Sequence, residues 1–259
     1  MGARPVLRVP GSGVVKAFGG AEADDADRQA TMATTLADAG VPVVRPLGHT
    51  VSAGAWTLLP LQDLPAALVV DDAGAWRGFG AALAALHGFA GAMKESVAPW
   101  RPLSVLDTWL AHAPDSGLAD DLRERAAALA AALPGGDELL HTDPHAGNVR
   151  LDADGRVVLI DLDGLARGDG RYDLGVVEAT ERRHHGRRHT LEWLLQGYAT
   201  RSARVGASDP ALRAAAALRE VLSIGWLVGR AGVDESALPL ARARLGDLAA
   251  GRDRLWAGL

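Results

Sequence analysis

The sequence predicts an α+β fold of two lobes, a small β-rich lobe at the N-terminus and a large helical lobe after it. β-branched runs separated by turn signals fill the opening segment, whereas apolar residues at helical spacing dominate the rest. Alanine supplies much of the 48 % hydrophobic share, which favours a helical core. We place the boundary in the segment LPLQDLP and expect lobes of residues 1–62 and 63–259.

The N-terminal lobe is expected to contain four strands and one helix. Residues 5–9 (PVLRV) and 13–18 (GVVKAF) are β-branched runs separated by the turn signal PGSG. Residues 21–40 indicate a helix, with acidic residues near its start and Gly40 as its stop. Residues 41–50 (VPVVRPLGHT) and 54–61 (GAWTLLPL) are expected to be two further strands.

The second lobe is expected to be helical apart from one hairpin. Apolar spacing predicts helices over residues 71–90, 102–113 and 118–133. The sequence DADG (152–155) is a hairpin turn signal, followed by a short buried strand, VVLID, that ends in Asp161. After Asp173 we expect three or four helices, the most apolar over residues 210–229, with the segment GASDP as its start.

Composition excludes several classes of protein. The chain has no cysteine, which excludes disulfides, thiolate zinc sites and a cysteine nucleophile. A net charge of -5 argues against nonspecific nucleic-acid binding, and no apolar run approaches the roughly 20 residues that span a bilayer. We therefore expect a cytoplasmic protein with no nucleic-acid or membrane partner. The basic run ERRHHGRRH (181–189) is expected to be a solvated helix end rather than a ligand-binding patch.

The motif HTDPHAGN (141–148) and the later LIDLD contain the residue types that phosphoryl transfer requires. A carboxylate such as Asp143 can accept the proton of a hydroxyl group. Asn148 and Asp161 provide the hard oxygen ligands that Mg²⁺ prefers. Lys16, on a strand of the small lobe, can reach across the cleft to nucleotide phosphates.

Other interpretations of the same residues remain open. His141, Asp143 and His145 resemble the ligands of a non-haem iron site, although few strands are expected here. A purely structural polar turn explains Asp143 and Asn148 but not Lys16 and Asp161. The segment DADG resembles the start of a calcium loop, but its glycine falls at position four rather than six.

HTDPHAGN followed by LIDLD resembles the catalytic loop and metal-binding aspartate of the aminoglycoside phosphotransferase and choline kinase family. Three further segments, AGVPVVRPL (39–47), LAALH (83–87) and GDGRYDLG (168–175), resemble other parts of these small-molecule kinases in the same order. The resemblance implies a bilobal protein-kinase-like fold, here with a shortened N-terminal lobe, since only fifteen residues precede Lys16.

The resemblance implies a role for each site residue. Asp143 is the catalytic base, Asn148 and Asp161 bind Mg²⁺, and Asp163 is near a second metal ion or the substrate. Lys16 contacts the α- and β-phosphates of ATP or GTP, whereas His141 and Asp173 are structural at the site. The backbone of Pro60, Leu61 and Gln62 meets the adenine edge.

Two positions depart from the family pattern. Thr142 stands where the family usually has glycine, so we expect the loop to have an ordinary backbone conformation there, because threonine tolerates positive φ poorly. Gln29 falls near the helix position of the acid that normally pairs with the lysine, although Asp25, Asp27 and Glu22 are close in sequence.

The resulting hypothesis is a phosphotransferase that moves the γ-phosphoryl group of ATP or GTP to a hydroxyl of a small molecule. The expected acceptor is an antibiotic such as an aminoglycoside or a related natural product, and the protein is expected to be a monomer or homodimer. There are two alternatives: a non-catalytic nucleotide-binding pseudokinase, or a metabolic kinase that acts on an amino alcohol or sugar. Acidic residues that we expect to line the acceptor site, and so to favour a cation, are Asp63, Asp143, Asp163 and Asp169.

Overall fold

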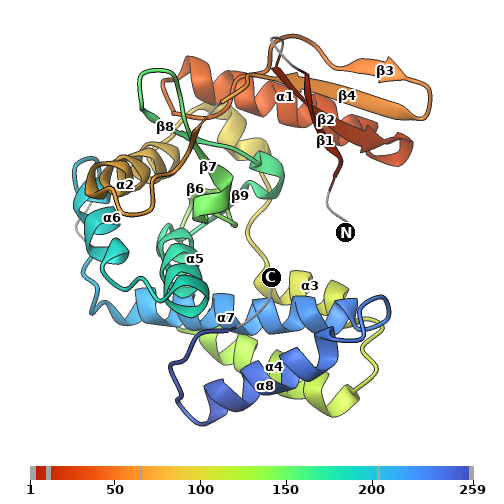
Figure 1. The fold of residues 1–259 in the computed structure, drawn as a ribbon, viewed down its shortest axis with the longest axis vertical. Helices are drawn as coiled ribbons and strands as arrows, with labels where there is room; N and C mark the ends of the chain where they lie inside the picture. Colours follow the sequence, from red (N-terminus) through yellow and green to blue (C-terminus); the bar gives the residue numbers. More distant parts are fainter. Residues whose placement is uncertain (1–3, 10–12, 65, 203–204, 257–259) are drawn as a thin grey trace.

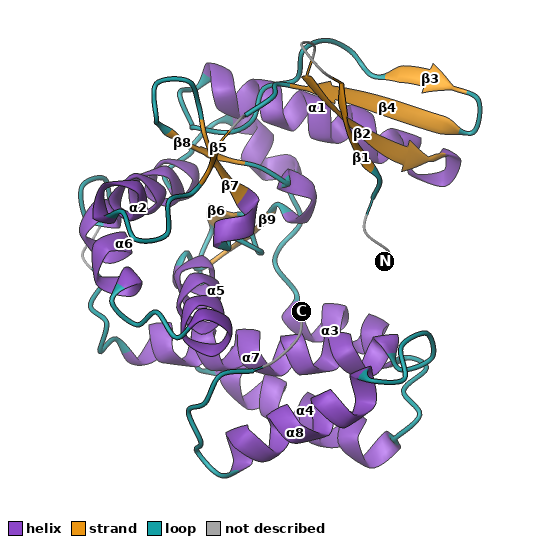
Figure 2. Ribbon diagram, in the orientation of Figure 1, coloured by secondary structure: helices purple, strands orange, loops and turns teal. Residues whose placement is uncertain are grey.

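The computed structural model describes residues 4–9, 13–64, 66–202 and 205–256 (Figure 1). A four-stranded sheet and a long helix form the N-terminal lobe, and helices form most of the rest of the chain (Figure 2). The predicted α+β organisation is confirmed. None of the helices in the described part of the chain is both long and apolar enough to cross a membrane.

The N-terminal sheet is antiparallel throughout, with strand order β1-β2-β4-β3. Its elements are β1 (Val6–Val9), β2 (Gly13–Gly19), β3 (Val51–Ala53), β4 (Trp56–Leu61) and helix α1 (Ala23–Asp38). Phe18, Ala26 and Leu59 are buried between the sheet and α1, so this lobe has only a small core. The turn predicted from PGSG falls largely on residues 10–12, which lie outside the described residues.

The strand predicted over residues 41–50 is wrong, whereas the helix stop at Gly40 is confirmed. Gly40 has φ +82°, and the amides of Gly40 and Val41 bond back into the last turn of α1. Residues 41–50 form an extended connector with isolated bridges, because prolines at 42 and 46 have no amide to donate to a ladder. The connector bonds to Leu159 of the second lobe and so joins the two lobes.

The second lobe contains short strands and most of the helices. The predicted hairpin is confirmed: β7 and β8 are antiparallel, and Gly155 in the turn has φ +76°. The strands are β5 (Ala66–Ala67), β6 (Glu138–Leu140), β7 (Val149–Leu151), β8 (Val157–Leu159) and β9 (Ala166–Gly168). The α-helices are α2 (Ala73–His87), α3 (Pro102–Leu110), α4 (Ser116–Ala131), α5 (Arg171–Thr180), α6 (Thr190–Tyr198), α7 (Pro210–Arg230) and α8 (Ala237–Ala249).

Two large hydrophobic cores stabilise this lobe. One surrounds α2 and includes residues of β6 to β8 and α6, and the other surrounds α7 and includes residues of α3, α4 and α8. The predicted start of α7 is confirmed, since the Asp209 carboxylate accepts the amide of Ala211 and Pro210 is the first helical residue. Helix α5 contributes to both cores and so fixes them relative to each other.

Helices α2 and α6 approach each other closely at two glycines. A Cβ atom added at Gly80 would lie 1.9 Å from the carbonyl oxygen of Leu194, and one at Gly197 would lie 1.9 Å from that of Arg77. The close approach brings together His87 and Tyr198, which end these two helices. The close crossing of α2 and α6 therefore fixes the positions of the His87 and Tyr198 side chains.

We expect the substitution Gly80→Ala to lower the free energy of unfolding by about 3 kcal/mol, because the packed backbone of α6 leaves no room for a methyl group. Urea denaturation would measure the change. The matched control is Gly117→Ala on the exposed face of α4, where alanine favours the helix and stability should rise by up to about 1 kcal/mol. Equal stability of the Gly80→Ala variant and the wild type would contradict this expectation.

Candidate active site

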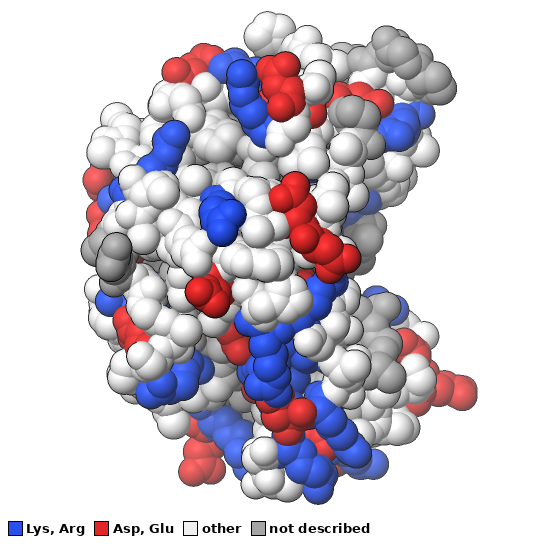
Figure 3. Space-filling model, turned by 60° about the vertical axis from the view of Figure 1, so that its left-hand side comes forward, with Lys and Arg blue, Asp and Glu red and all other residues white. Residues whose placement is uncertain are grey.

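The loop of residues 141–148 connects β6 to β7 and lies where the two hydrophobic cores meet. Leu139 belongs to the core around α2, and Leu140 belongs to the core around α7. The strand that leads into the loop is therefore held from both sides. Figure 3 shows a hollow on one side of the molecule, between the sheet-containing part and the lower helices.

The fully buried carboxylate of Asp173 holds the start of the loop. It accepts the backbone amides of His141 at 2.7 Å and Thr142 at 2.9 Å. The same carboxylate bonds to His87 Nε2 at 2.9 Å, and His87 Nδ1 bonds to the Tyr198 hydroxyl at 2.9 Å. Three helices, α2, α5 and α6, thus fix the loop through one side chain.

The ordinary backbone expected at Thr142 is wrong, because the residue has φ +72° in the left-handed region. Long-range contacts stabilise this conformation. The Thr142 amide donates to Asp173, and its hydroxyl donates to the Gly164 carbonyl at 2.9 Å. His141 is also fully buried, and its Nε2 bonds to the Ile160 carbonyl at 2.8 Å. The loop is therefore joined to the segment that follows β8.

Asp143 forms an ion pair that the sequence did not reveal. Its Oδ1 lies 2.7 Å from a terminal nitrogen of Arg219 on α7. Burial acts to raise the pKa of Asp143, but the charges of Arg219 and the neighbouring histidines outweigh it and hold that pKa below its ordinary value. Burial also lowers the pKa of His145, whose Nδ1 accepts the Gly147 amide and whose Nε2 lies 3.8 Å from Asp143. Asp143 is therefore ionised at neutral pH.

Asn148 directly precedes β7 and Asp161 follows β8, so both lie at the same end of the paired strands. The Asn148 side-chain nitrogen donates to the Asp143 carbonyl at 3.0 Å, and its backbone carbonyl accepts the Ile160 amide at 3.0 Å. Its amide oxygen has no partner among the described residues. Asp161 follows β8 with φ +61° and ψ +60°, and its carboxylate meets Lys16.

Lys16 is 5 % exposed and joins the two lobes electrostatically. Its Nζ lies 2.5 Å from Asp161 and 2.6 Å from Asp163. Gln29, near the expected position of a helix partner, donates to Asp163 instead of contacting the lysine, and Arg4 pairs with the same carboxylate. In the described chain the partners of Lys16 therefore come from the segment after β8, not from an acid of α1.

The oxygen atoms around Asp161 are suitable ligands for a magnesium ion. Asp161 and Asp163 supply carboxylate oxygens, Asn148 supplies an amide oxygen, and the Lys16 ammonium already lies against both carboxylates. No group of three or more His, Asp or Glu within the described ranges is arranged to hold a metal by itself. Mg²⁺ commonly uses one or two carboxylates and completes its shell with water and phosphate oxygens.

The expected adenine-binding segment lies at the end of β4. Two of its backbone groups already have partners: the Pro60 carbonyl accepts the Leu47 amide at 3.0 Å, and the Gln62 amide donates to the Arg45 carbonyl at 2.8 Å. Leu61 pairs with Val14 across the sheet. The connector at residues 41–50 therefore orders this segment.

A cavity of about 710 Å³ opens beside Asp143. Its walls come from β5, α3, α7, the turn after α5 and the C-terminal segment. Of the four acidic residues expected there, only Asp143 lines the cavity, and the other three lie elsewhere and make ion pairs. Asp63 pairs with Arg8, Asp163 with Lys16 and Arg4, and Asp169 with Arg171.

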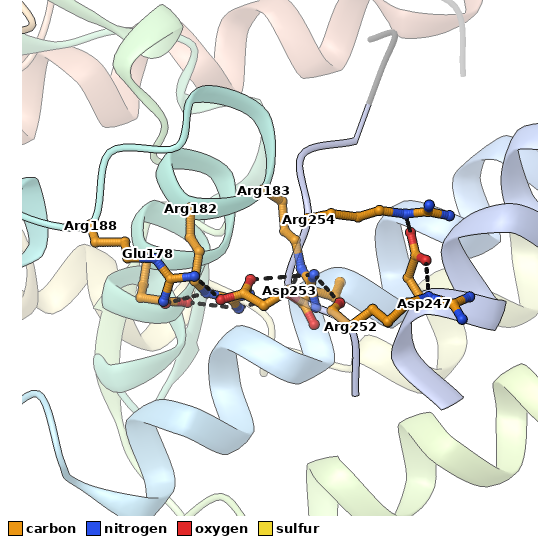
Figure 4. Close-up of polar contacts among 9 residues, drawn as sticks. Glu178, Arg182, Arg183, Arg188, Asp247, Arg252, Asp253 and Arg254 are labelled. Atoms are coloured by element: carbon orange, nitrogen blue, oxygen red, sulfur yellow. Dashed lines mark hydrogen bonds and ion pairs between the residues drawn. The ribbon is translucent and has the colours of Figure 1, made fainter. Parts of the chain in front are cut away.

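The basic run at residues 181–189 is not simply a solvated helix end. Its first half forms a π-helical turn, η5 (Glu181–His185), and Arg183 is 5 % exposed and lines the cavity. Figure 4 shows Arg182 and Arg183 reaching Asp253 of the C-terminal segment. Arg183 also lies 4.7 Å from the centroid of the Trp256 ring, which lines the same cavity.

Sequence reasoning missed the residues that complete this cavity. It assigned none of Trp109, Trp226, Trp256 and Arg219 to the site, although all four line the cavity. Trp109 and Trp226 also pack against the core around α7. His184, expected to be exposed, is half-buried against Trp256. The cluster of arginines and histidines after α5 was the one available signal.

The sequence model described as the phosphotransferase enzyme family matches residues 6–220 of the chain. The chain belongs to this family. The match covers the sheet, the loop at residues 141–148 and helix α7 as far as Glu220, and so confirms the resemblance drawn from HTDPHAGN and LIDLD. A search of curated protein sequences finds no match.

Solved structures of other kinases have the fold of this phosphotransferase-family chain. The choline kinase LicA from Streptococcus pneumoniae has TM-score 0.67 and 14 % identity, over 95 % of this chain and 89 % of that one. Macrolide 2'-phosphotransferase MphH from Brachybacterium faecium has TM-score 0.62 and 20 % identity, over 93 % and 87 %. An aminoglycoside phosphotransferase from Streptomyces rimosus, in complex with ADP and streptomycin, has TM-score 0.61 and 21 % identity, over 84 % and 90 %. These similarities confirm the protein-kinase-like fold.

We expect Asp173→Asn to lower the free energy of unfolding by roughly 2–4 kcal/mol, because an amide nitrogen would face a buried donor and leave it unpaired. Guanidinium denaturation would measure the change. Asp154→Asn in the exposed 152–155 turn is the control and should be neutral. A stable Asp173→Asn variant would show that the loop is held by other contacts.

Glu181 is expected to make stability depend on pH. The side chain is 1 % exposed, and burial raises its pKa to about 7 from an ordinary value of 4.5, against the opposing charge of Arg187. The folded state therefore holds the proton that the unfolded state has released, so stability falls as pH rises from about 4.5 to 7. The loss should reach roughly 2–3 kcal/mol above pH 7.

The Glu181→Gln variant cannot ionise, so it should gain stability relative to the wild type as pH rises from 5 to 8. Urea denaturation at several pH values would measure this difference. Glu124→Gln, on an exposed part of α4, is the control and should follow the wild type at every pH. A difference between Glu181→Gln and the wild type that does not vary with pH would contradict the expectation.

Proposed function

We propose that the protein transfers the γ-phosphoryl group of ATP or GTP to a hydroxyl group of a small molecule. The observation that carries the proposal is the place of Asp143, which lines the cavity and belongs to the same short loop as Asn148. The loop faces Asp161, and Asp161 faces Lys16 of the other lobe. An acceptor in the cavity and a nucleotide near Lys16 would therefore meet at Asp143.

The proposed reaction is a direct displacement at phosphorus. The acceptor oxygen forms a bond to the γ-phosphorus as the bond from that phosphorus to the β–γ bridging oxygen breaks, and the nucleoside diphosphate leaves. The hydroxyl proton passes to Asp143. Because Arg219 holds the pKa of Asp143 low, this carboxylate orients the hydroxyl and takes its proton late in the reaction.

The nucleotide is proposed to bind between Lys16 and the segment after β8. Lys16 would exchange its contacts with Asp161 and Asp163 for the α- and β-phosphates. Asn148 and Asp161 would hold Mg²⁺, with Asp163 at a second metal ion or near the substrate. The metal supplies positive charge against the phosphates. The backbone at Pro60 to Gln62, which the connector orders, would meet the purine edge.

Structural relatives support a small-molecule acceptor. They include a choline kinase, a macrolide 2'-phosphotransferase, and two antibiotic phosphotransferases in complex with ADP and either streptomycin or spectinomycin. By analogy we propose an antibiotic or a related natural product as the acceptor, with an amino alcohol or sugar of metabolism as the alternative. The cavity volume of about 710 Å³ suits a ligand of this size.

We expect the wild type to release nucleoside diphosphate from ATP or GTP with Mg²⁺ when a suitable hydroxyl acceptor is present. Asp143→Asn should lower kcat by at least about 100-fold, because it removes the proton acceptor. The Kd for nucleotide should change little, since Asp143 lines the acceptor cavity. A coupled assay across aminoglycosides, macrolides, nucleosides and amino alcohols, with calorimetry for nucleotide binding, would measure both quantities.

The control is Asp154→Asn, an exposed aspartate in the 152–155 turn, which should leave kcat and Kd unchanged. Normal turnover by Asp143→Asn would remove this residue from the proposed role. No turnover with any acceptor, together with nucleotide binding that does not depend on Mg²⁺, would favour the pseudokinase alternative.

A further inference from the structure

The cavity beside Asp143 has broad aromatic walls. Trp109 comes from α3, Trp226 from α7 and Trp256 from the C-terminal segment, and Leu68 and Leu222 also line the cavity. Trp109 and Trp226 are half-buried, whereas Trp256 is buried with its ring against Arg183. Indole rings offer large rigid surfaces that stabilise the apolar parts of a ligand. The shape and composition of the walls therefore favour an acceptor with an extended apolar surface.

The carboxylates that line the cavity are already paired. Asp143 lies 2.7 Å from Arg219, and Glu220 accepts bonds from Arg182 at 2.7 Å and Arg183 at 2.5 Å. Among the described lining residues, no carboxylate remains for an amino group of a ligand. A polycation would have to displace an arginine for each ammonium that it brought into the cavity.

Arg187 lines the cavity and differs from the other two lining arginines, Arg183 and Arg219. Within the described chain its ionic partner is Glu181, whose carboxylate lies 3.0 Å from Nε, and its terminal nitrogens make no hydrogen bond. Burial raises the pKa of Glu181 to about 7, so near neutral pH this carboxyl compensates only part of the charge of Arg187. Two parallel donors of a guanidinium match the two oxygens of a carboxylate.

We propose that the acceptor is a hydroxyl compound with an apolar body and a carboxylate or similar anionic group, which Arg187 binds while the tryptophans cover the body. This inference narrows the proposed function. It rests on that function only in calling the bound compound the acceptor of the phosphoryl group. The inference concerns binding in the cavity, so it can be tested without nucleotide or turnover. It disfavours polycations such as aminoglycosides as substrates of this chain.

Three probes of equal size separate charge from shape. They are 6-(hydroxymethyl)-2-naphthoate, its carboxamide, and the corresponding aminomethyl compound, each measured by calorimetry with the full chain at pH 7. We expect the carboxylate to bind at least about 10-fold more tightly than the carboxamide, and the amine to bind most weakly. Arg187→Gln should remove the preference for the carboxylate and leave the carboxamide affinity within about 2-fold.

Two further variants keep the test decisive. Arg188→Gln alters the adjacent arginine, which is exposed, pairs with Asp253 and does not line the cavity, and should behave as the wild type. Arg187→Lys keeps the positive charge but loses the paired donors of the guanidinium, so it should retain part of the preference for the carboxylate. Thermal melting of every variant, and the carboxamide affinity itself, would reveal a variant that loses binding because it is misfolded.

Several results would overturn the inference. The amine binding as tightly as the carboxylate, Arg187→Gln leaving the preference intact, or no probe binding at millimolar concentration would each do so. Rapid phosphorylation of a polycationic aminoglycoside by the wild type would refute it while supporting the proposed function. The opposite pattern, with the expected probe affinities but no phosphoryl transfer to any acceptor, would refute the proposed function alone.

Discussion

The geometry of the candidate site depends on one buried carboxylate. Asp173 accepts two successive backbone amides at the start of the loop and a third bond from His87, so its charge is compensated by donors from separate elements. The left-handed backbone at Thr142 depends on it, because without these bonds two buried amides would lack partners. The direction of Asp143, the next residue, follows from that conformation.

Ion pairs in this structure occupy the positions where ligands are proposed to bind. Lys16 lies against Asp161 and Asp163, and Arg219 lies against Asp143, so each candidate functional charge is neutralised by another. Binding of phosphates or an acceptor would exchange these contacts rather than fill an open charged site. The net affinity of a ligand would then be a difference between two sets of interactions of similar kind.

Local signals in the sequence predicted what local forces determine. Gly40 ends α1, and Pro210 begins α7, because each residue has its conformational preference wherever it occurs. The strand expected over residues 41–50 was wrong because its β-branched residues suggested pairing that its prolines prevent. The left-handed backbone of Thr142 could not be predicted, because contacts with residues more than twenty positions away outweigh the residue's own steric preference. Arg219 and Trp256 join the site only through tertiary packing.

Trp256, which lines the cavity, belongs to the C-terminal segment and not to the loop at residues 141–148. The backbone amide of Trp256 bonds to the Arg183 carbonyl, and Arg183 in turn bonds to Glu220 and the Arg252 carbonyl. Ion pairs of Asp253 with arginines of the turn after α5, and of Arg252 and Arg254 with Asp247, also attach the segment to the helical lobe. Substitutions between residues 250 and 256 can therefore reshape the cavity without altering Asp173 or the loop that it holds. The selectivity for a ligand and the geometry at Asp143 thus rest on different residues of the chain, so one can change while the other is kept.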